Sequence, residues 1–596
     1  MNKAAVFHHA SVPYAYPVGP DHLRVVLQAQ RGDLTAVTVA YRDRYEPDSA
    51  NETTDLVREA SDLLADYWVA TVPRRRAHYQ FHLVDAVGEE AWLGERGFSP
   101  ASPQPPADGG FQYPYIAPAD RFQAPSWLDG GTVFYQIFPD RFANGDPGND
   151  PPGTVPWGSP PTREDLQGGD LKGVAQHIGH LEELGVGGLY MTPIFESSSN
   201  HKYNTRDYYR IDPGFGDLDD LKRLVEAAHQ RGIRVLLDAV FNHAGHDFFA
   251  FEDCIRKGRA SRYWDWFHIE GDQVRTEYPC NYETFSTHLT YMPKLMTQNP
   301  EVADYLLDVA AYWLRQAGID GWRLDVANEV DHAFWRAFRR RVKSVNPEAW
   351  ILGEIWHDSL EWLRGDQYDS VMNYPFRDAL LAFFRGTVDA SHLDELLARV
   401  RMQYAWDVTA NLLNLLGTHD TPRIRTLIGR DRSLLAAVMM MTYPGVPLIY
   451  YGDEVGMEGG QDPGCRGAMD WSRQSWDREA LALHKRLVQI RRVFPWLRDG
   501  GYRTLVAEPG GTLFGFERTA ALPGVPGRDQ RQGRLVTLVN NAPGTATAAL
   551  PAEGPMVDLL TGELHTAGGG RLALTLGPWQ AVVLAPQSQA EAAGLV

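Results

Sequence analysis

The chain has 596 residues, of which 44% are hydrophobic, so we expect two to four domains with large cores. Its formal net charge of −19 argues against nucleic acid as a partner, because nucleic-acid binders carry basic patches or stripes. No stretch approaches the ~20 apolar residues that cross a membrane, and residues 1–12 lack the apolar run of a signal peptide. The cysteines Cys254, Cys280 and Cys465 give neither a disulfide framework nor a metal-ligand spacing. We expect a cytoplasmic protein without a nucleic-acid or membrane partner.

The first part of the chain, residues 1–125, has the pattern of a small β-sandwich. Apolar and polar residues alternate over 23–27, 36–40 and 77–84, as they do in strands with one buried face. A Pro-rich, polar stretch over 99–108 then predicts a linker. We therefore expect an N-terminal β-sandwich that is separate from the rest of the chain.

From about residue 130 short apolar segments alternate with amphipathic helices. The expected strands lie at 133–138, 188–192, 234–238, 321–324, 350–353, 370–372, 411–416 and 446–450. The expected helices lie at 171–184, 218–230, 302–316, 332–345 and 478–493. Eight such repeats predict an α/β fold, a (β/α)8 TIM barrel over residues 126–500, with its functional site at the carboxyl ends of the strands.

Two further segments complete the expected architecture. The interval between the third and fourth expected strands is too long for one helix, which predicts a small inserted subdomain over 244–298. After residue 500 strands dominate again, at 512–518, 535–540 and 579–585. We expect a C-terminal β-sandwich over 501–596.

The segment Gly321-Trp322-Arg323-Leu324-Asp325 places an Arg and an Asp on one face of a buried strand end. The guanidinium of Arg323 is expected to hold Asp325 ionised, as a carboxylate nucleophile requires. Glu354 ends another apolar run beside Ile355 and Trp356, a setting that favours the protonated form. Two such carboxyl groups are the minimum for cleaving a glycosidic bond. Taken alone, an Arg-x-Asp pair is more often a structural ion pair.

Four segments resemble sequence regions of the α-amylase family, glycoside hydrolase family 13, and stand in the family's order. They are Asp238-Ala-Val-Phe-Asn-His243, Gly321-Trp-Arg-Leu-Asp325, Gly353-Glu354 and Thr418-His-Asp420. The resemblance implies that Asp325 is the nucleophile and that Glu354 acts first as general acid and then as general base. It also implies that Asp420 binds hydroxyls of the distorted sugar at subsite −1, in a reaction that retains the α configuration.

The resemblance further implies that substrate-binding residues surround these three acids. Arg323 would hold Asp325 ionised, His243 and His419 would donate to sugar hydroxyls, and Tyr203 would stack on the −1 ring. Asp238 belongs to the same set. Each has a plainer reading: an Asx turn for Asp238, a satisfied core histidine for His243 or His419, and packing for Tyr203.

Two more segments, Met292-Pro-Lys-Leu295 and Val326-Ala-Asn-Glu329, resemble those of the cyclomaltodextrinase, neopullulanase and maltogenic amylase subgroup. This resemblance implies α-1,4 cleavage of cyclodextrins, pullulan and maltooligosaccharides, with some transglycosylation. It also implies a homodimer formed through the N-terminal domain, with Glu329 and Trp356 at the acceptor side. The alternatives are an α-glucosidase or sugar isomerase on the same barrel and, less in keeping with the three acids, a non-catalytic glucan-binding protein.

A turn-rich loop is full of oxygen ligands of the kind that Ca²⁺ prefers. It resembles the calcium site of several subgroup members, which implies a structural Ca²⁺ that takes no part in the reaction. The alternative is an Asx-rich surface turn. The candidate ligands are Asn144, Asp146, Asn149, Asp150, Gly168 and Asp170.

Overall fold

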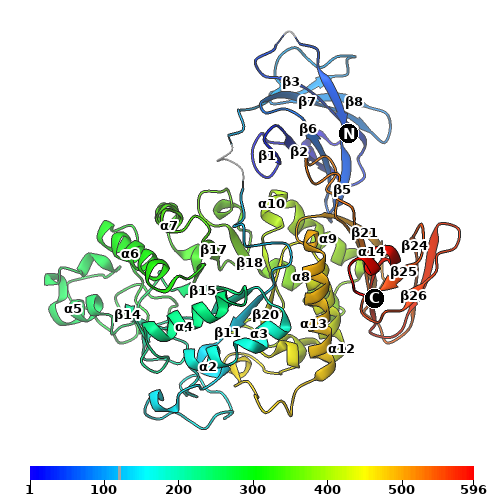
Figure 1. Cartoon of the computed structure of the whole chain (residues 1–596). Helices are drawn as coiled ribbons and strands as arrows, with labels where there is room; N and C mark the ends of the chain where they lie inside the picture. The colour runs from blue at the N-terminus through cyan, green and yellow to red at the C-terminus, as the bar shows by residue number, and fades with distance from the viewer. Residues whose placement is uncertain (48, 118–121) are drawn as a thin grey trace.

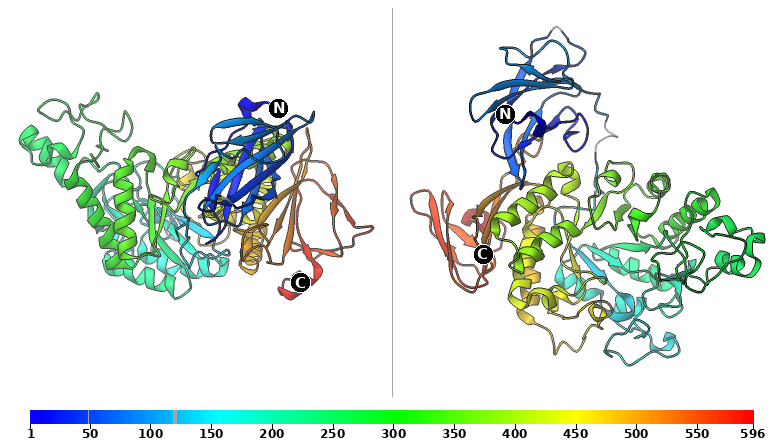
Figure 2. Two further views of the ribbon diagram at one scale, coloured as in Figure 1. Left: turned by 90° about the horizontal axis from the view of Figure 1, so that it is seen from above. Right: turned by 180° about the vertical axis from the view of Figure 1, so that it is seen from behind.

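The computed structural model describes residues 1–47, 49–117 and 122–596, and the chain forms three parts (Figure 1). An N-terminal β domain stands on a central α/β barrel, and a C-terminal β domain packs against the side of the barrel. The N-terminal and C-terminal domains lie next to each other in the views of Figures 1 and 2. At their contact the Thr71 side chain lies close to Gly524. Among the described residues, none of the helices has the length and apolar content needed to cross a membrane.

The central domain is a closed barrel of parallel strands, as the sequence predicted. Each strand pairs with the next, and the first also pairs with the last. Inside the barrel an apolar layer that includes Phe134, Leu236, Trp350 and Leu448 fills the space below the site. The strands are β11 (Phe134–Ile137), β12 (Gly188–Met191), β15 (Arg234–Ala239), β16 (Gly321–Leu324), β17 (Trp350–Gly353), β18 (Ser370–Asn373), β19 (Leu413–Leu415) and β20 (Val446–Tyr450).

The helices around the barrel include the five expected ones, but the first of them is broken. Instead of one helix over 171–184 there are α2 (Leu171–Gln176) and α3 (Ile178–Leu184), because His177 leaves the helical backbone conformation. The others are α4 (Leu218–His229), α6 (Pro300–Ala317), α7 (His332–Val345) and α13 (Arg478–Val493). Asn299 and Asp331 cap α6 and α7 through side-chain oxygens, which fixes where these helices begin.

Three long helices were not predicted: α8 (Tyr374–Phe384), α9 (Ala390–Met402) and α12 (Arg430–Thr442). In α12 the run from Leu435 to Thr442 is buried on every side, so the alternation of apolar and polar faces that marks an amphipathic helix is missing. Most of α8 is buried in the same way. The periodicity of apolar residues identifies helices with one solvent-exposed face, and it misses helices that are buried on all sides.

Two excursions of the chain shape the top of the barrel. Between β15 and α6 the chain forms α5 (Phe249–Lys257) and a loop region tied by single bridges such as Phe267 to Leu295. A second excursion, not predicted, is the hairpin of β13 (Phe195–Ser197) and β14 (Thr205–Ile211). Both rise from the carboxyl ends of the strands, where the candidate site was expected.

The N-terminal domain consists of two antiparallel sheets around a common core. One contains β1 (Ala15–Pro17), β2 (Leu23–Gln30), β6 (Ala65–Val72) and β5 (Val57–Ser61). The other contains β4 (Glu52–Asp55), β3 (Leu34–Asp43), β7 (Ala77–Asp85), β8 (Glu90–Gly94), β9 (Gly97–Pro100) and β10 (Phe111–Tyr113). Because β10 pairs with β7, the Pro-rich stretch over 99–108 is a loop inside this sheet and the linker prediction was wrong. Residues 48 and 118–121 of the expected domain lie outside the described residues.

The C-terminal domain has a larger sheet and a two-stranded one. The larger contains β21 (Gly501–Ala507), β22 (Leu513–Thr519), β23 (Arg534–Asn540), β28 (Ala581–Pro586), β25 (Met556–Asp558) and β26 (Leu564–His565). The smaller pairs β24 (Ala546–Pro551) with β27 (Arg571–Leu576), and α14 (Gln587–Ala592) follows the last strand. Arg518 on β22 joins this domain to the barrel by donating to the carbonyl oxygen of Thr442 at the end of α12.

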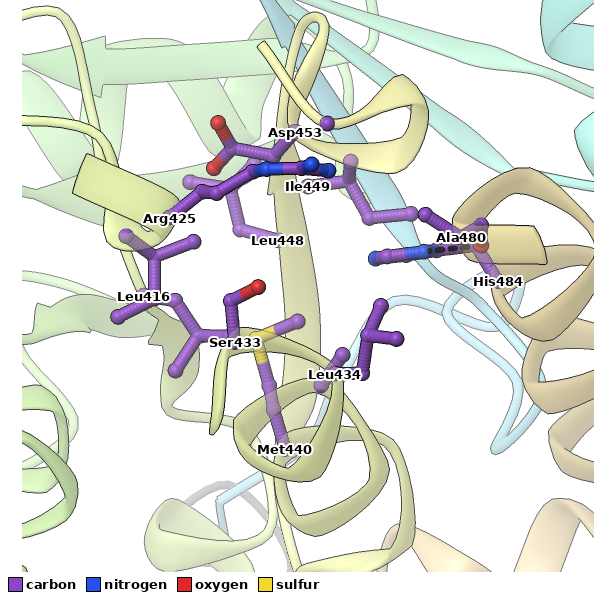
Figure 3. Close-up of a pocket in the computed structure, with 13 residues that line it drawn as sticks. Leu416, Arg425, Ser433, Leu434, Met440, Leu448, Ile449, Asp453, Ala480 and His484 are labelled. Carbon is purple, nitrogen blue, oxygen red and sulfur yellow. Dashed lines mark hydrogen bonds between the residues drawn. The ribbon is translucent and has the colours of Figure 1, made fainter. Parts of the chain in front are cut away.

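A small cavity lies beside β20, between α12 and α13 (Figure 3). Its wall is mainly apolar, with Met440 and Ile449 among the lining residues, and His484 points its ring into it. The His484 Nδ1 is bonded to the Ala480 carbonyl oxygen at 2.8 Å. The cavity volume is ≈20 Å³. One water needs roughly 10–15 Å³, so the cavity has room for about one water molecule. It is too small to bind a substrate.

Candidate active site

The candidate residues meet at the carboxyl ends of the barrel strands, as the eightfold repeat predicted. Asp238 is on β15 and Arg323 on β16, while Asp325 and Glu354 directly follow β16 and β17. A cleft of ≈850 Å³ opens above them. The candidate residues that line this cleft are Tyr203, His243, Asp325, Glu354, Trp356 and Asp420.

Arg323 is the centre of the site and contacts three carboxylates. Its Nη1 lies 2.9 Å from Asp238 Oδ2 and 2.7 Å from Asp325 Oδ1, and its Nη2 lies 2.8 Å from Glu354 Oε2. The guanidinium itself is fully buried. Strand alternation predicted the contact with Asp325, and the two further partners, Asp238 and Glu354, are brought to Arg323 only by the closure of the barrel.

Because one buried cation faces three carboxylates, the pKa values of these carboxyl groups differ from those that we expected. Burial raises the pKa of Asp325 well above its usual value, and the charges of Glu354 and Asp238 add to this while Arg323 opposes it. Burial likewise raises the pKa of Asp238 to about 6. Arg323 does lower the pKa of Asp325, as expected, but burial outweighs the guanidinium, so the expectation of a low net pKa was wrong. The raised pKa values favour a bound proton in this cluster, and the chemistry needs one protonated and one ionised carboxyl group.

Glu354 is held by polar groups and not by the apolar neighbourhood that its sequence predicted. The backbone N–H of Val326 donates to its Oε2 at 3.0 Å, and the Trp356 indole N–H donates to its Oε1 at 3.2 Å. Val326 has φ of 45°, an unfavourable left-handed conformation for a β-branched residue. The turn directly after Asp325 is therefore strained, and it aims a donor at the second carboxylate.

A chain of hydrogen bonds runs beneath the cleft from β11 to β15. The side-chain amide of Gln136 donates to His419 Nδ1 at 2.8 Å, and His419 Nε2 meets the Tyr203 hydroxyl at 2.7 Å. Tyr203 in turn donates to Asp238 at 3.0 Å, as Tyr190 does at 2.7 Å. Burial lowers the pKa of His419 well below its usual value, so the ring is neutral. Tyr203 and His419 thus orient Asp238; Tyr203 also lines the cleft, whereas the buried His419 does not.

Asp420 differs from the other two acids because its side chain is one-third exposed. Arg466 Nη2 donates to its Oδ1 at 3.2 Å, and Arg466 Nε donates to the backbone oxygen of His419 at 2.8 Å. Sequence reasoning did not find Arg466, Gln136 or Tyr190. The last two could have been found by applying strand alternation to β11 and β12, whereas Arg466 comes from a distant loop.

His243 and Trp356 offer free groups at the cleft wall. Burial lowers the pKa of His243 to about 3, so its ring is neutral, and among the described residues its Nε2 has no hydrogen-bond partner. Trp356 is 45% exposed and stacks on Tyr374 with ring centroids 3.7 Å apart. Glu329 is placed less centrally: it pairs with Lys294 at 3.4 Å and does not line the cleft.

Comparison with known proteins agrees with this geometry. Residues 136–503 match the α-amylase catalytic domain, and residues 1–117 match the α-amylase N-terminal Ig-like domain. The chain belongs to the α-amylase family. It is 48% identical to neopullulanase 2 of Thermoactinomyces vulgaris, over 98% of this chain and 99% of that one. It is 42% identical to an intracellular maltogenic amylase of Bacillus subtilis, over 83% and 84%. The structure of a cyclomaltodextrinase superposes with a TM-score of 0.92 at 40% identity, over 98% and 100%.

Family membership does not decide whether the loop over 144–150 binds calcium, which depends on the contacts of the loop itself. Asn144 Oδ1 and Asn149 Oδ1 are buried and have no hydrogen-bond partner among the described residues, and the Asn144 amide donates to Asp150 at 2.8 Å. Asp170 is occupied as the cap of α2, and Asp146 pairs with Lys172 at 2.5 Å. Within the described chain no three His, Cys, Asp or Glu side chains gather as a metal site. A metal here would thus depend on amide and backbone oxygens, which fits a hard cation such as Ca²⁺.

Proposed function

We propose that this chain is a retaining α-glucan hydrolase that cleaves α-1,4 bonds of cyclodextrins, pullulan and maltooligosaccharides. The observation that carries the proposal is the guanidinium of Arg323 in contact with Asp238, Asp325 and Glu354 at the floor of the cleft. A shared guanidinium keeps Asp325 and Glu354 close together, as a retaining enzyme with carboxyl groups ~5–5.5 Å apart requires. The names of its relatives support the choice of substrates.

In the first step Asp325 attacks the anomeric carbon while Glu354 gives its proton to the departing glycosidic oxygen. The bond to the leaving sugar breaks as the bond to Asp325 forms, which gives a covalent glycosyl-enzyme. Glu354, now ionised, takes a proton from water, and the hydroxide portion displaces Asp325. Two inversions leave the product in the α configuration. When a sugar hydroxyl takes the place of water, the same step transfers the glycosyl group.

The remaining residues bind and orient the sugar. Asp420 and the free Nε2 of His243 face the cleft and would hold hydroxyl groups at subsite −1. Tyr203 offers an aromatic ring for stacking, while its hydroxyl stays on Asp238. Trp356 presents an exposed indole on the side of Glu354, where the leaving or accepting sugar would lie.

A product profile tests the proposed substrates. The protein is incubated with β-cyclodextrin, pullulan, soluble starch and sucrose, and the sugars are separated. We expect fast opening of β-cyclodextrin and release of panose from pullulan, with slower action on starch. Action on sucrose or maltose alone would place the chain with the α-glucosidases or isomerases.

We also propose a structural Ca²⁺ in the loop over 144–150 and 168–170, held mainly by the amide oxygens of Asn144 and Asn149 and by backbone oxygens. The two unpartnered amide oxygens, of Asn144 and Asn149, support it. The loop meets α2 and thereby the first helical layer of the barrel, so a bound ion would fix this corner and supply no chemistry to the reaction.

The chain is further proposed to act as a cytoplasmic homodimer joined through the N-terminal domain. The description of the Bacillus subtilis relative as intracellular supports the location. Exposed apolar side chains on the N-terminal domain, with Leu63 at 64%, Leu64 at 77% and Tyr45 at 68%, support an interface there. Sedimentation of the full chain checks this, and a monomer at every concentration would contradict it.

A further inference from the structure

A second pocket adjoins the active-site cleft. It has a volume of ≈500 Å³, and it shares the side chains of Trp356 and Asp420 with the cleft. Its other walls come from α8, which contributes Arg377 and Leu381, and from the loops that follow β19 and β20. None of the steps described above uses this space, although it lies directly beside the point of cleavage.

Trp356 forms the partition between the two spaces. One face of its indole is covered by Tyr374, in a parallel stack at 3.7 Å, and its N–H is bonded to Glu354. These contacts fix the ring while 45% of the residue stays exposed. A glucan chain that occupied both spaces would have its branch point close to Glu354 and Asp420.

The wall on α8 carries a buried cation with an unused donor. Arg377 is only 7% exposed; its Nε donates to the Leu416 carbonyl oxygen at 3.1 Å and its Nη1 to Asp378 at 3.1 Å. No hydrogen bond within the described residues involves its Nη2, and Arg377 lines the pocket. A guanidinium N–H that reaches the pocket can donate to an acceptor oxygen brought in by a ligand.

The charges and surfaces of the pocket indicate a neutral, hydroxyl-rich ligand. Two cations, Arg377 and Arg385, stand against two carboxylates, Asp378 and Asp420, so the charged lining balances. An anionic ligand such as a phosphate would find no excess of positive charge. Apolar side chains interleave with the polar ones, which suits the C–H faces and hydroxyl edges of a glucosyl unit. They include Leu381, Ala382, Pro422 and Leu427.

We propose that this space is a branch pocket, which binds glucosyl residues attached through an α-1,6 bond to the sugar at the cleavage point. It thereby sets how well the enzyme accepts branched α-glucans. The proposal rests on the proposed function, since it assigns a further part of the same substrate. The pocket is open on its outer side, so a branch of several sugars could continue into solvent.

The test compares a branched and an unbranched cyclic substrate, 6-O-α-maltosyl-β-cyclodextrin and β-cyclodextrin. Ala382 is partly buried on the wall of the branch pocket and takes no part in the catalytic machinery. Ala382→Trp fills the pocket, and we expect kcat/KM for the branched substrate to fall about tenfold or more while that for β-cyclodextrin is unchanged. Ala382→Ser, which leaves the space open, is the matched control and keeps both rates.

A second variant guards against a folding failure. Arg385 is exposed on the outer wall, so Arg385→Ala is tolerated by the fold, and we expect it to lower only the rate on the branched substrate, by a few fold. Equal losses on both substrates, or unchanged rates in Ala382→Trp and Arg385→Ala, would overturn the proposal. So would a change in sedimentation with either variant, which would assign the pocket to a second copy of the chain. If the unmodified chain opens neither substrate, the proposed function fails instead.

Discussion

Two buried guanidinium groups, at the barrel mouth and at the joint with the C-terminal domain, differ in what surrounds them. Arg323 at the mouth contacts the carboxylates of Asp238, Asp325 and Glu354. Arg518 at the joint donates only to backbone carbonyl oxygens, those of Gly501, Thr442, Leu497 and Gly500. Both side chains are fully buried.

The different partners give the two groups different properties. Burial lowers the pKa of Arg518 to about 9, because carbonyl oxygens offer no negative charge. At Arg323 burial acts in the same direction, but Asp238 and Glu354 reverse it and raise the pKa well above its usual value. The mouth therefore contains groups that exchange protons, while the joint contains a fixed set of hydrogen bonds. We expect damage at the mouth to change chemistry and damage at the joint to change stability.

The largest effect is expected from Asp325→Asn. The neutral amide of Asn cannot act as a nucleophile in place of the carboxylate, so kcat should fall by roughly 10⁴-fold or more. The melting temperature should stay close to that of the unmodified chain. The control is Asp320→Asn at the other end of β16, where Asp320 pairs with Arg234 at 3.1 Å. That change should lower stability and leave kcat unchanged. Substantial turnover by Asp325→Asn in steady-state assays would refute its role.

Arg323→Met removes the cation that opposes the high pKa of its neighbours. We expect kcat/KM to fall by roughly 10²–10³-fold, because preorganised charge at the reacting centre is lost. The acid limb of the pH–rate profile should move to higher pH, since the carboxyl groups of Asp238 and Asp325 then protonate more readily. If kcat/KM falls but the acid limb of the profile does not move, Arg323 contributes only to packing and not to the pKa values of its neighbours.

Arg518→Met breaks the joint without touching the mouth. Several carbonyl oxygens would lose their buried donor, at a cost of about 2–4 kcal/mol in the free energy of unfolding. Thermal and urea unfolding measure that cost, and kcat on β-cyclodextrin measured below the transition should be unchanged. A large fall in kcat of the folded variant would show that the two regions are coupled.

The unmodified chain should lose activity as the pH falls below about 6. Burial raises the pKa of Asp238 to about 6, so this group is ionised above that pH and gains a proton below it. Burial raises the pKa of Asp325 as well, so falling pH also favours its protonated form, which is not a nucleophile. A profile of kcat/KM against pH checks this. An acid limb near pH 4, the ordinary range of carboxyl groups, would contradict it.

The smallest effect is expected from removing Ca²⁺. Chelation should lower the melting temperature by about 2–4 °C and leave kcat unchanged below the transition, because the ion would only tie a loop to α2. Asn149→Ala removes one of the two free amide oxygens and should abolish this difference. Calorimetry with and without chelator decides it, and identical melting curves for the unmodified chain would exclude the ion.

The local sequence pattern predicted the barrel strands and the candidate acids Asp325, Glu354 and Asp420, because both are recognised from residues that are adjacent in the sequence. The helix α7 was predicted with its observed bounds, since it has one apolar and one wet face and an Asp cap. The unpredicted α12 has no wet face along much of its length. The hairpin that carries Tyr203 was missed because β13 has only 3 residues and the register between its strands is irregular.

The contacts of the site depend on closure of the barrel, which local pattern does not contain. Arg323 on β16 and Asp325 directly after it were paired correctly, but Asp238 reaches Arg323 from β15 and Glu354 from the end of β17. Arg466 reaches Asp420 from a loop beyond β20. For the same reason burial, which sets the pKa of Asp325, could not be judged from residues 321–325 alone.

The most direct test of the account is the covalent adduct on Asp325. The Glu354→Gln variant is mixed with α-maltosyl fluoride, whose leaving group needs no acid, quenched in acid, digested and analysed by mass spectrometry. Without Glu354 as general base the glycosyl-enzyme should accumulate, and the added maltosyl mass should lie on the peptide that contains Asp325. An adduct on Asp238 or Asp420, or turnover of the fluoride without any adduct, would contradict the account.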